Sequence, residues 1–88
     1  MHYTYLLASQ QNGQWYIGST SDLRDRMQRH NQGRNISTKS GRPWKLIYYE
    51  AYLDKRDSIG REKFLKSGSG RKFLKKQIRH YIDMKEGR

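Results

Sequence analysis

The first 18 residues of the chain carry the pattern of a β-hairpin. Two β-prone runs, at residues 3–8 and 15–18, flank Gln11-Asn12-Gly13, and Asn-Gly between such runs is a strong turn signal. If Asn12 and Gly13 are the central turn residues, the numbers of paired positions sum to 25. Tyr5 and Tyr16 then project from one face, some way apart along the strands, because side chains alternate along a strand. A longer loop would bring the two tyrosines closer, and the sequence leaves both registers open.

A helix is expected directly after the hairpin, over about residues 22–31. Asp22 is an N-cap candidate and Gly33 is a stop signal. Arg26 and His30 are four residues apart and therefore lie on one face of this helix. Packing alone would not select a guanidinium and an imidazole at these positions, so the helix is a candidate carrier of functional side chains.

The rest of the chain predicts one more strand and two more helices. A polar loop over residues 33–44 precedes a strand over residues 45–53, and Asp54 precedes a second helix. The Ser- and Gly-rich segment 67–70 breaks the chain before a third helix over about residues 71–84. The order β-β-α-β-α-α predicts the α+β class, with a small three-stranded, mainly antiparallel sheet flanked by three helices.

The composition indicates a single small domain. Only 33% of the 88 residues are hydrophobic, so the core must be small, while the 12% of aromatic residues argues against disorder. We expect one domain over residues 1–84 and a frayed tail over residues 85–88. The absence of cysteine excludes disulfides, thiolate zinc sites and a thiol nucleophile. With no leader pattern and no apolar run of membrane-spanning length, we expect a cytoplasmic protein without a membrane partner.

The net charge of +11 is uneven along the chain. Residues 55–88 hold twelve Lys or Arg against four Asp or Glu, which is +8 of the total of +11. We expect a nucleic acid as the partner, because phosphate neutralisation and counterion release supply much of the affinity of such complexes. A solvated basic surface is the alternative. The candidate contacts to the nucleic-acid backbone are Lys39, Arg42, Lys72, Lys75, Lys76 and Arg79.

An ordered set of short motifs spans nearly the whole chain. Tyr3-Thr4-Tyr5 is followed by Tyr16-Ile17-Gly18, then by Arg26 and His30, and finally by Arg61-Glu62-Lys63. With these motifs in this order and spacing, the chain resembles the GIY-YIG nuclease domain, and in particular its small stand-alone bacterial versions. Tyr3 and Thr4 replace the Gly and Ile of the first triplet. Many family members also have an asparagine after the metal-binding glutamate, whereas no Asn follows Asn35 here.

The resemblance implies roles for five residues: Tyr5, Tyr16, Arg26, His30 and Glu62. Tyr5 would act as a base, with nearby cations and a metal-bound water lowering a phenol pKa that is ordinarily about 10. Tyr16 would hydrogen-bond the attacking water or the phosphate, Arg26 would grip the phosphate, and His30 would relay a proton or bind the phosphate. Glu62 would hold Mg²⁺ or Mn²⁺.

Each of these residues also has an ordinary structural interpretation. The two tyrosines can simply pack on the sheet, Arg26 can be a solvated helix residue, and His30 can be structural or exposed. On spacing alone, Glu62 is an i,i+4 ion-pair partner of Lys66. The resemblance, and not the spacing, favours a metal ligand. We expect Tyr5, Tyr16, Arg26 and Glu62 to converge on one concave face of the sheet.

The leading hypothesis is a metal-dependent endonuclease, or a structure-selective nuclease, that hydrolyses DNA in repair, recombination or processing. The alternative from another class is a non-catalytic nucleic-acid-binding module on the same scaffold. A third hypothesis is a subunit that needs a partner protein for substrate choice, because 88 residues leave little room for a separate recognition domain. The sequence does not distinguish single-stranded, double-stranded and branched DNA, and it does not indicate an oligomeric state.

Overall fold

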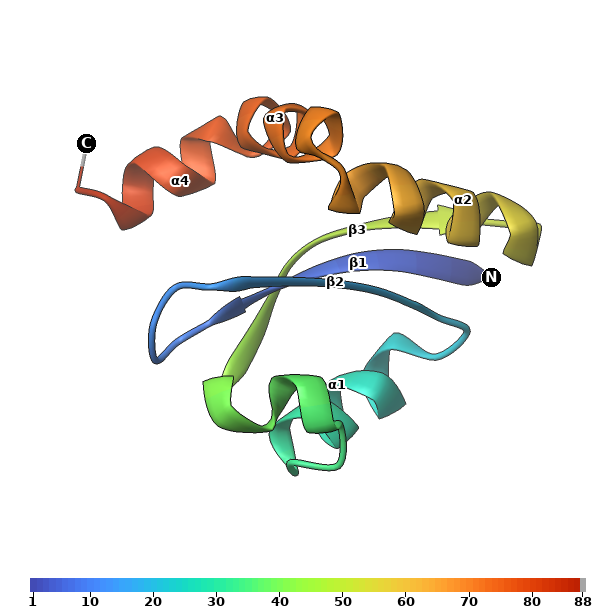
Figure 1. Ribbon diagram of the computed structural model, residues 1–88, viewed down its shortest axis with the longest axis horizontal. Coiled ribbons are helices and arrows are strands. Elements are labelled where there is room, and N and C mark those ends of the chain that lie inside the picture. The colour runs from blue at the N-terminus through green and yellow to red at the C-terminus, as the bar shows by residue number, and fades with distance from the viewer. Residues whose placement is uncertain (88) are drawn as a thin grey trace.

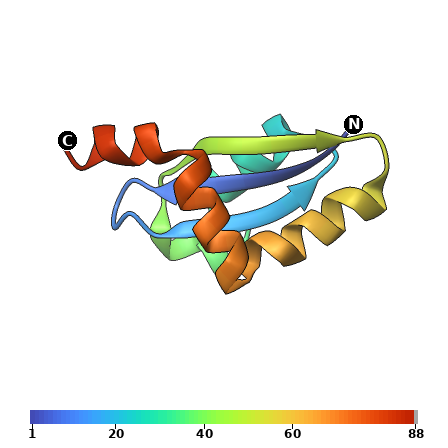
Figure 2. The same ribbon diagram turned by 90° about the horizontal axis from the view of Figure 1, so that it is seen from above.

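The computed structural model describes residues 1–87 (Figure 1). Its elements, in chain order, are β1 (His2–Ser9), β2 (Trp15–Thr20), α1 (Leu23–Asn31), the 3-10 helix η1 (Ile36–Gly41), β3 (Trp44–Tyr52), α2 (Lys55–Lys66), α3 (Gly68–Gln77) and α4 (Arg79–Lys85). The strands form one antiparallel sheet in the order β2-β1-β3, which confirms the predicted α+β class. α1 and η1 cover one face of the sheet, and α2 and α3 cover the other (Figures 1 and 2).

The central strand β1 supplies the core of both layers, because its side chains alternate between the two faces. Tyr5 packs with Trp44 on the side of α1. Leu6 packs with Leu65 and Leu74 on the side of α2 and α3. Burying a large apolar side chain stabilises the fold by about 1.5–3 kcal/mol. A domain this small therefore depends heavily on one strand, and a catalytic tyrosine placed on it would be rigidly held.

The register of the hairpin differs from the tight-turn prediction. Tyr5 pairs with Gly18, and Leu7 pairs with Tyr16, so paired positions sum to 23 and not to 25. The longer loop was the other register that the sequence allowed. In this register Tyr5 and Tyr16 are diagonal neighbours on adjacent strands, a spacing within reach of aromatic side chains.

The longer loop is stabilised by Ser9, which is buried at the end of β1. The backbone N–H of Ser9 donates to the carbonyl of Gln14 at 2.8 Å. The tight turn would have paired Gln14 with Gln11, so the first strand ends its pairing two residues earlier than that register requires. Its hydroxyl accepts from the backbone N–H of Gln11 and donates to the carbonyl of Gly41 at 2.7 Å. A contact with a residue 32 positions away in sequence therefore helps to set the register.

The first helix forms as predicted. The side chain of Asp22 accepts from the backbone N–H of Asp25 and so caps α1. Gly33 has φ +76°, the left-handed conformation that ends helices and favours glycine. The loop predicted over residues 33–44 is more ordered than expected, since it contains η1.

The C-terminal region holds two helices where one was predicted over residues 71–84. Ser67 ends α2 and also caps α3, with its hydroxyl accepting from the backbone N–H of Gly70. A side chain at Gly70 would overlap the backbone of Leu65, so this glycine allows α2 and α3 to meet closely. The segment thus breaks the helical path at Ser67 as predicted, and its glycines form the first turn of α3. A second interruption, which was not predicted, lies at Ile78, whose φ and ψ are −114° and 33°.

The end of the chain bears on two further predictions. α4 extends to Lys85, and residue 88 lies outside the described residues, so the frayed tail over residues 85–88 stays a prediction. Within residues 1–87, the helices are too short and too polar for any of them to span a bilayer.

Candidate active site

A buried chain of hydrogen bonds links the first motif tyrosine to α1 and η1. The hydroxyl of Tyr5 lies 2.9 Å from Nε2 of His30, and Nδ1 of His30 lies 2.7 Å from Oγ1 of Thr38. Tyr5 is 1% exposed, and His30 and Thr38 are 0% exposed. These contacts join β1 to α1, 25 residues further along the chain, and α1 to the η1 that follows it. The sequence analysis assigned catalytic roles to Tyr5 and His30, but it assigned none to Thr38, which lies in a segment that also matches the family.

We assign the His30 tautomer from this network. Oγ1 of Thr38 can donate to the carbonyl of Asn35 at 3.4 Å, which leaves it free to accept the Nδ1–H of His30. Nε2 is then unprotonated and accepts the hydroxyl proton of Tyr5. Burial, followed by the charge of Arg26, lowers the pKa of His30 below its ordinary value of 6.5. The imidazole is therefore neutral at pH 7 and able to take a proton.

Gly18 gives the Tyr5 hydroxyl its room. A Cβ at this position would lie 2.5 Å from Oη of Tyr5 and 2.7 Å from its Cζ. Because Gly18 is on the edge strand β2, the phenol can cross that strand and reach the border of the sheet. The glycine of the second motif is thus required by space and not by its φ angle.

Tyr16 completes an aromatic cluster on the same face. Its ring centroid lies 6.4 Å from that of Tyr5, 5.1 Å from that of His30 and 6.3 Å from that of Trp44. Trp44 donates its indole N–H to the carbonyl of Thr38 at 2.6 Å, which ties η1 to this cluster. The prediction that Tyr5 and Tyr16 project from the same face of the sheet is confirmed.

Arg26 is the charged neighbour that the other candidates share. Burial and the nearby Tyr16 raise the pKa of Tyr5 to about 12, and the charge and hydrogen bond of Arg26 offset only part of this rise. Arg26 therefore lowers the pKa of Tyr5, as expected of a nearby cation, but burial outweighs this one guanidinium and the pKa stays raised. The phenol keeps its proton at pH 7, and its removal depends on a neighbouring acceptor.

Glu62 approaches from the opposite layer. It is carried by α2, which packs on the sheet face away from Tyr16 and lies beyond the β2 edge when seen from above (Figure 2). Its Oε1 accepts from the hydroxyl of Ser19 on β2 at 2.7 Å. The prediction of one concave face is thus wrong. The candidate site straddles the β2 edge, where the charge of Glu62 acts on Tyr5 and that of Arg26 acts on Glu62.

The second oxygen of Glu62 is also engaged. Oε2 accepts from Nζ of Lys66 at 2.7 Å, the i,i+4 ion pair that the sequence offered as the structural alternative. Burial raises the pKa of Glu62, but the hydrogen bonds from Lys66 and Ser19 outweigh it and hold the pKa below 4.5. The carboxylate is therefore ionised, and Ser19, which sequence reasoning missed, orients it.

A second ion pair fixes α2 to the sheet beside Glu62. Arg61 donates to Glu50 on β3, with Nε and Oε1 2.8 Å apart, and both side chains are largely buried. The hydroxyls of Tyr48 and Tyr52 donate to the same carboxylate. This network satisfies the buried charge of Glu50 and holds the helix turn that carries Glu62 in place.

The residues near Glu62 fit a hard divalent cation that keeps most of its water ligands. Within residues 1–87 there is no cluster of three or more His, Cys, Asp or Glu side chains. Glu62 is an ionised carboxylate at the β2 edge, it accepts a hydrogen bond from the hydroxyl of Ser19, and its charge acts on Tyr5. Mg²⁺ commonly binds to one or two carboxylates and takes its other ligands from water and substrate phosphate. Binding through Oε2 requires Lys66 to move away, which its 54% exposed side chain permits.

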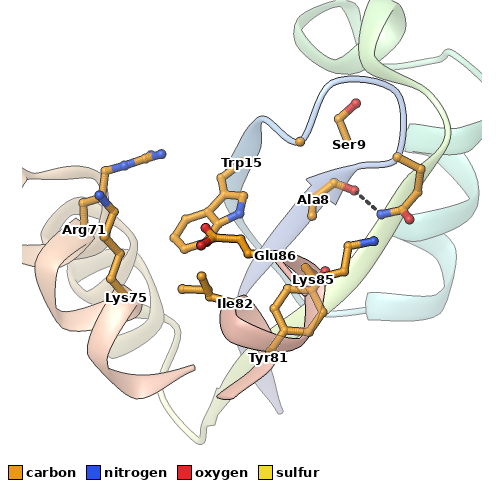
Figure 3. Close-up of a pocket in the computed structure, with 11 residues that line it drawn as sticks. Ala8, Ser9, Trp15, Arg71, Lys75, Tyr81, Ile82, Lys85 and Glu86 are labelled. Atoms are coloured by element: carbon orange, nitrogen blue, oxygen red, sulfur yellow. Dashed lines mark hydrogen bonds between the residues drawn. The ribbon is translucent and has the colours of Figure 1, made fainter. Parts of the chain in front are cut away.

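The predicted backbone-contact residues fall on two separate surfaces. Lys72, Lys75 and Lys76 lie on α3, and Arg79 begins α4. Lys39 and Arg42 lie in and after η1, in the other layer. Figure 3 shows Lys75 and Arg71 beside Trp15 around a hollow of about 570 Å³ between the hairpin and the two C-terminal helices. None of the five candidate catalytic residues lines this hollow.

The chain matches one family model and several bacterial relatives. The family model described as the GIY-YIG catalytic domain matches residues 1–77. UPF0213 protein YazA of Bacillus subtilis is 34% identical over 85 residues, which cover 96% of this chain and 80% of that protein. UPF0213 protein SSP2268 of Staphylococcus saprophyticus is 35% identical over 75 residues, which cover 84% of this chain and 90% of that protein. No solved structure gives a significant match.

Proposed function

The chain belongs to the GIY-YIG nuclease family, and we propose that it is a metal-dependent endonuclease that hydrolyses phosphodiester bonds of DNA. The observation that carries this proposal is the chain from Tyr5 through His30 to Thr38, with Arg26 and Glu62 acting on its Tyr5 end. A phenol with a neutral imidazole behind it, a guanidinium and an ionised carboxylate are the groups that phosphodiester hydrolysis needs. A setting in DNA repair, recombination or processing is part of the same proposal.

The proposed base is Tyr5 acting together with His30. As Oη of Tyr5 takes a proton from the attacking water, the hydroxyl proton of Tyr5 passes to Nε2 of His30. Oγ1 of Thr38 accepts the Nδ1–H and so stabilises the imidazolium that forms. This transfer removes the difficulty of a phenol whose pKa is about 12, because free phenolate never accumulates.

Arg26 and Tyr16 would act on the phosphate. The Arg26 guanidinium can stabilise the negative charge that builds on the phosphoryl oxygens. Tyr16 would hydrogen-bond the water or the phosphate from the adjacent strand. Nucleases of this family depend in general on a divalent metal ion. Glu62 would hold Mg²⁺ or Mn²⁺, which would supply charge neutralisation at the phosphate and the leaving oxygen.

A non-catalytic nucleic-acid-binding module is the second candidate. The observation that favours it is the ion pair between Lys66 and Glu62, which already neutralises the proposed metal ligand. The absence of an asparagine after Asn35 points the same way. A requirement for a partner protein in substrate choice is compatible with either candidate.

The test is cleavage of a panel of labelled DNA and RNA structures with Mg²⁺, Mn²⁺ or EDTA, comparing the wild type with Glu62→Gln. Glutamine keeps the shape of the side chain and its bond with Ser19 but removes the charge. The enzyme proposal expects metal-dependent cleavage that is lost in the variant, with DNA binding in EDTA retained. Binding without cleavage above the variant's background on any substrate would establish the binding module instead.

A further inference from the structure

An arginine-lined hollow of about 580 Å³ lies beside the candidate active site. Its lining residues come from α1 and the start of η1, and they are Arg26, Arg29, Arg34, Asn35, Ile36 and Ser37. No carboxylate is among them. Arg29 is paired with Asp25 at the surface, whereas Arg26 and Arg34 have no ion pair among residues 1–87. We call this hollow the arginine cleft, and its charge suits a nucleic-acid backbone.

The arginine cleft is continuous with the candidate active site. Arg26 lines it and also acts on the pKa of Tyr5, His30 and Glu62. A strand whose scissile phosphate rests at Arg26 would therefore place neighbouring phosphates along Arg29 and Arg34. This continuity is absent from the lysine surface of α3, which lies in the other layer of the fold.

Ile36 is an apolar side chain held out at the rim of this cleft. It is 94% exposed. It is the first residue of η1, in a turn held by side-chain hydrogen bonds. Oδ1 of Asn35 accepts from the backbone N–H and the hydroxyl of Ser37, at 3.1 and 2.7 Å, and Thr38 is buried against His30. Single exposed aliphatic residues are common on proteins. This one differs because it lines the same hollow as Arg34, which has no ion pair among residues 1–87, and because it lies on a turn whose Thr38 is hydrogen-bonded to His30.

We infer that Ile36 is a wedge that enters an opened base step of DNA, while Arg34 and Arg29 hold the phosphates beside it. The inference rests on the proposed function and names its substrate class: duplex DNA with an unstacked step, such as a nick, a mismatch or a branch point. Proteins that insert apolar side chains between bases pay a few kcal/mol per unstacked step. That cost is smaller where the base step is already open. A wedge therefore makes the protein bind DNA with an open step more tightly than intact duplex, without recognising the base sequence.

The experiment compares Ile36→Ser with Leu53→Ser, a matched control. Leu53 is 89% exposed in the connection between β3 and α2, so both variants remove one exposed aliphatic side chain and neither threatens the core. Binding is measured in EDTA at fixed salt to an intact duplex and to the same duplex with a nick, each carrying 2-aminopurine at the step. The wild type should bind the nicked duplex about tenfold tighter and raise the 2-aminopurine fluorescence.

Ile36→Ser should lose this preference and the fluorescence rise while keeping its affinity for the intact duplex. Leu53→Ser should behave as the wild type, and Arg34→Gln should weaken binding to both duplexes alike. An Ile36→Ser protein that keeps the preference, or a wild type without one, would overturn the wedge. Failure of the proposed function looks different. A wild type that neither binds nor cleaves DNA defeats both proposals. Cleavage without tighter binding to the nicked duplex defeats only the wedge. Tighter binding to the nicked duplex that depends on Ile36, without any cleavage, supports the wedge and defeats the enzyme proposal.

Discussion

Replacing Thr38 by valine would remove one hydroxyl from the buried relay and leave the shape of the side chain nearly unchanged. Thr38 is 0% exposed, and its Oγ1 accepts the Nδ1–H of His30 at 2.7 Å. Leaving a buried donor without a partner costs about 1–3 kcal/mol. The 3.4 Å bond from Thr38 to Asn35 is long and adds little to this loss. For a domain of this size, the melting temperature should fall by roughly 5–20 °C.

The effect of Thr38→Val on cleavage should be larger than its effect on stability. Without an acceptor at Nδ1, His30 favours the tautomer that carries its hydrogen on Nε2, facing Tyr5. Nε2 can then no longer take the Tyr5 proton, and the proposed base is disabled. Proton transfer by a positioned side chain contributes typically about 10²–10⁴-fold, so single-turnover cleavage should slow by about 10²-fold or more.

The matched control is Thr38→Ser, which keeps the hydroxyl and loses only a methyl group. Thermal melts give the stability of both variants, and cleavage is then measured at a temperature where all three proteins are folded. DNA binding in EDTA should be equal in the three. Cleavage by the valine variant at the wild-type rate would refute the relay. Equal losses in the serine and valine variants would assign the effect to packing around Thr38 and not to its hydroxyl.

Three further predictions follow from the same geometry. Gly18→Ala should abolish cleavage and leave DNA binding intact, since the new Cβ would lie 2.5 Å from the Tyr5 hydroxyl. An active alanine variant would show that Tyr5 need not reach the sheet edge. Lys66→Met should lower the Mg²⁺ concentration needed for half-maximal cleavage, because it frees one oxygen of Glu62; an unchanged or higher requirement would contradict competition between Lys66 and the metal. Because burial and the charge of Arg26 lower the pKa of His30 below 6.5 in the folded state, the stability from neutral His30 is present above pH 6.5 and is lost as the pH falls below it. Melts of the wild type and His30→Gln from about pH 8 to about pH 5 should therefore converge toward acid pH, and parallel curves would argue against a neutral buried imidazole.

Much of the fold was predictable from local signals. α1 begins after Asp22 and ends before Gly33, as predicted. An N-cap side chain and a left-handed glycine provide hydrogen-bond partners for backbone groups only a few residues away, so both signals are local. Tyr5 and Tyr16 share a face in either hairpin register, since their parity is the same when paired positions sum to 23 or to 25. The interruption at Ile78 was missed because it has no Gly or Pro signal in the sequence.

The candidate site was predictable only as a list of residues. The motifs identified Tyr5, Arg26, His30 and Glu62, but their roles depend on distances between elements that the motifs do not encode. Residue types and spacings indicate hydrogen bonds between residues close in sequence, and they indicate which face of a helix or strand is buried. They do not report how far a side chain is removed from water, and that burial determines the raised pKa of Tyr5 and the neutral state of His30.

Long-range packing decided the remaining features. The hairpin register depends on Ser9 reaching Gly41, and the orientation of the His30 ring depends on Thr38. Ser19 holds Glu62 from a strand 43 residues earlier in the chain. Local patterns reflect the free energy of short segments and so can be recognised in sequence. The β2-edge site depends on contacts between segments far apart in the chain, which exist only after both helical layers have packed on the sheet.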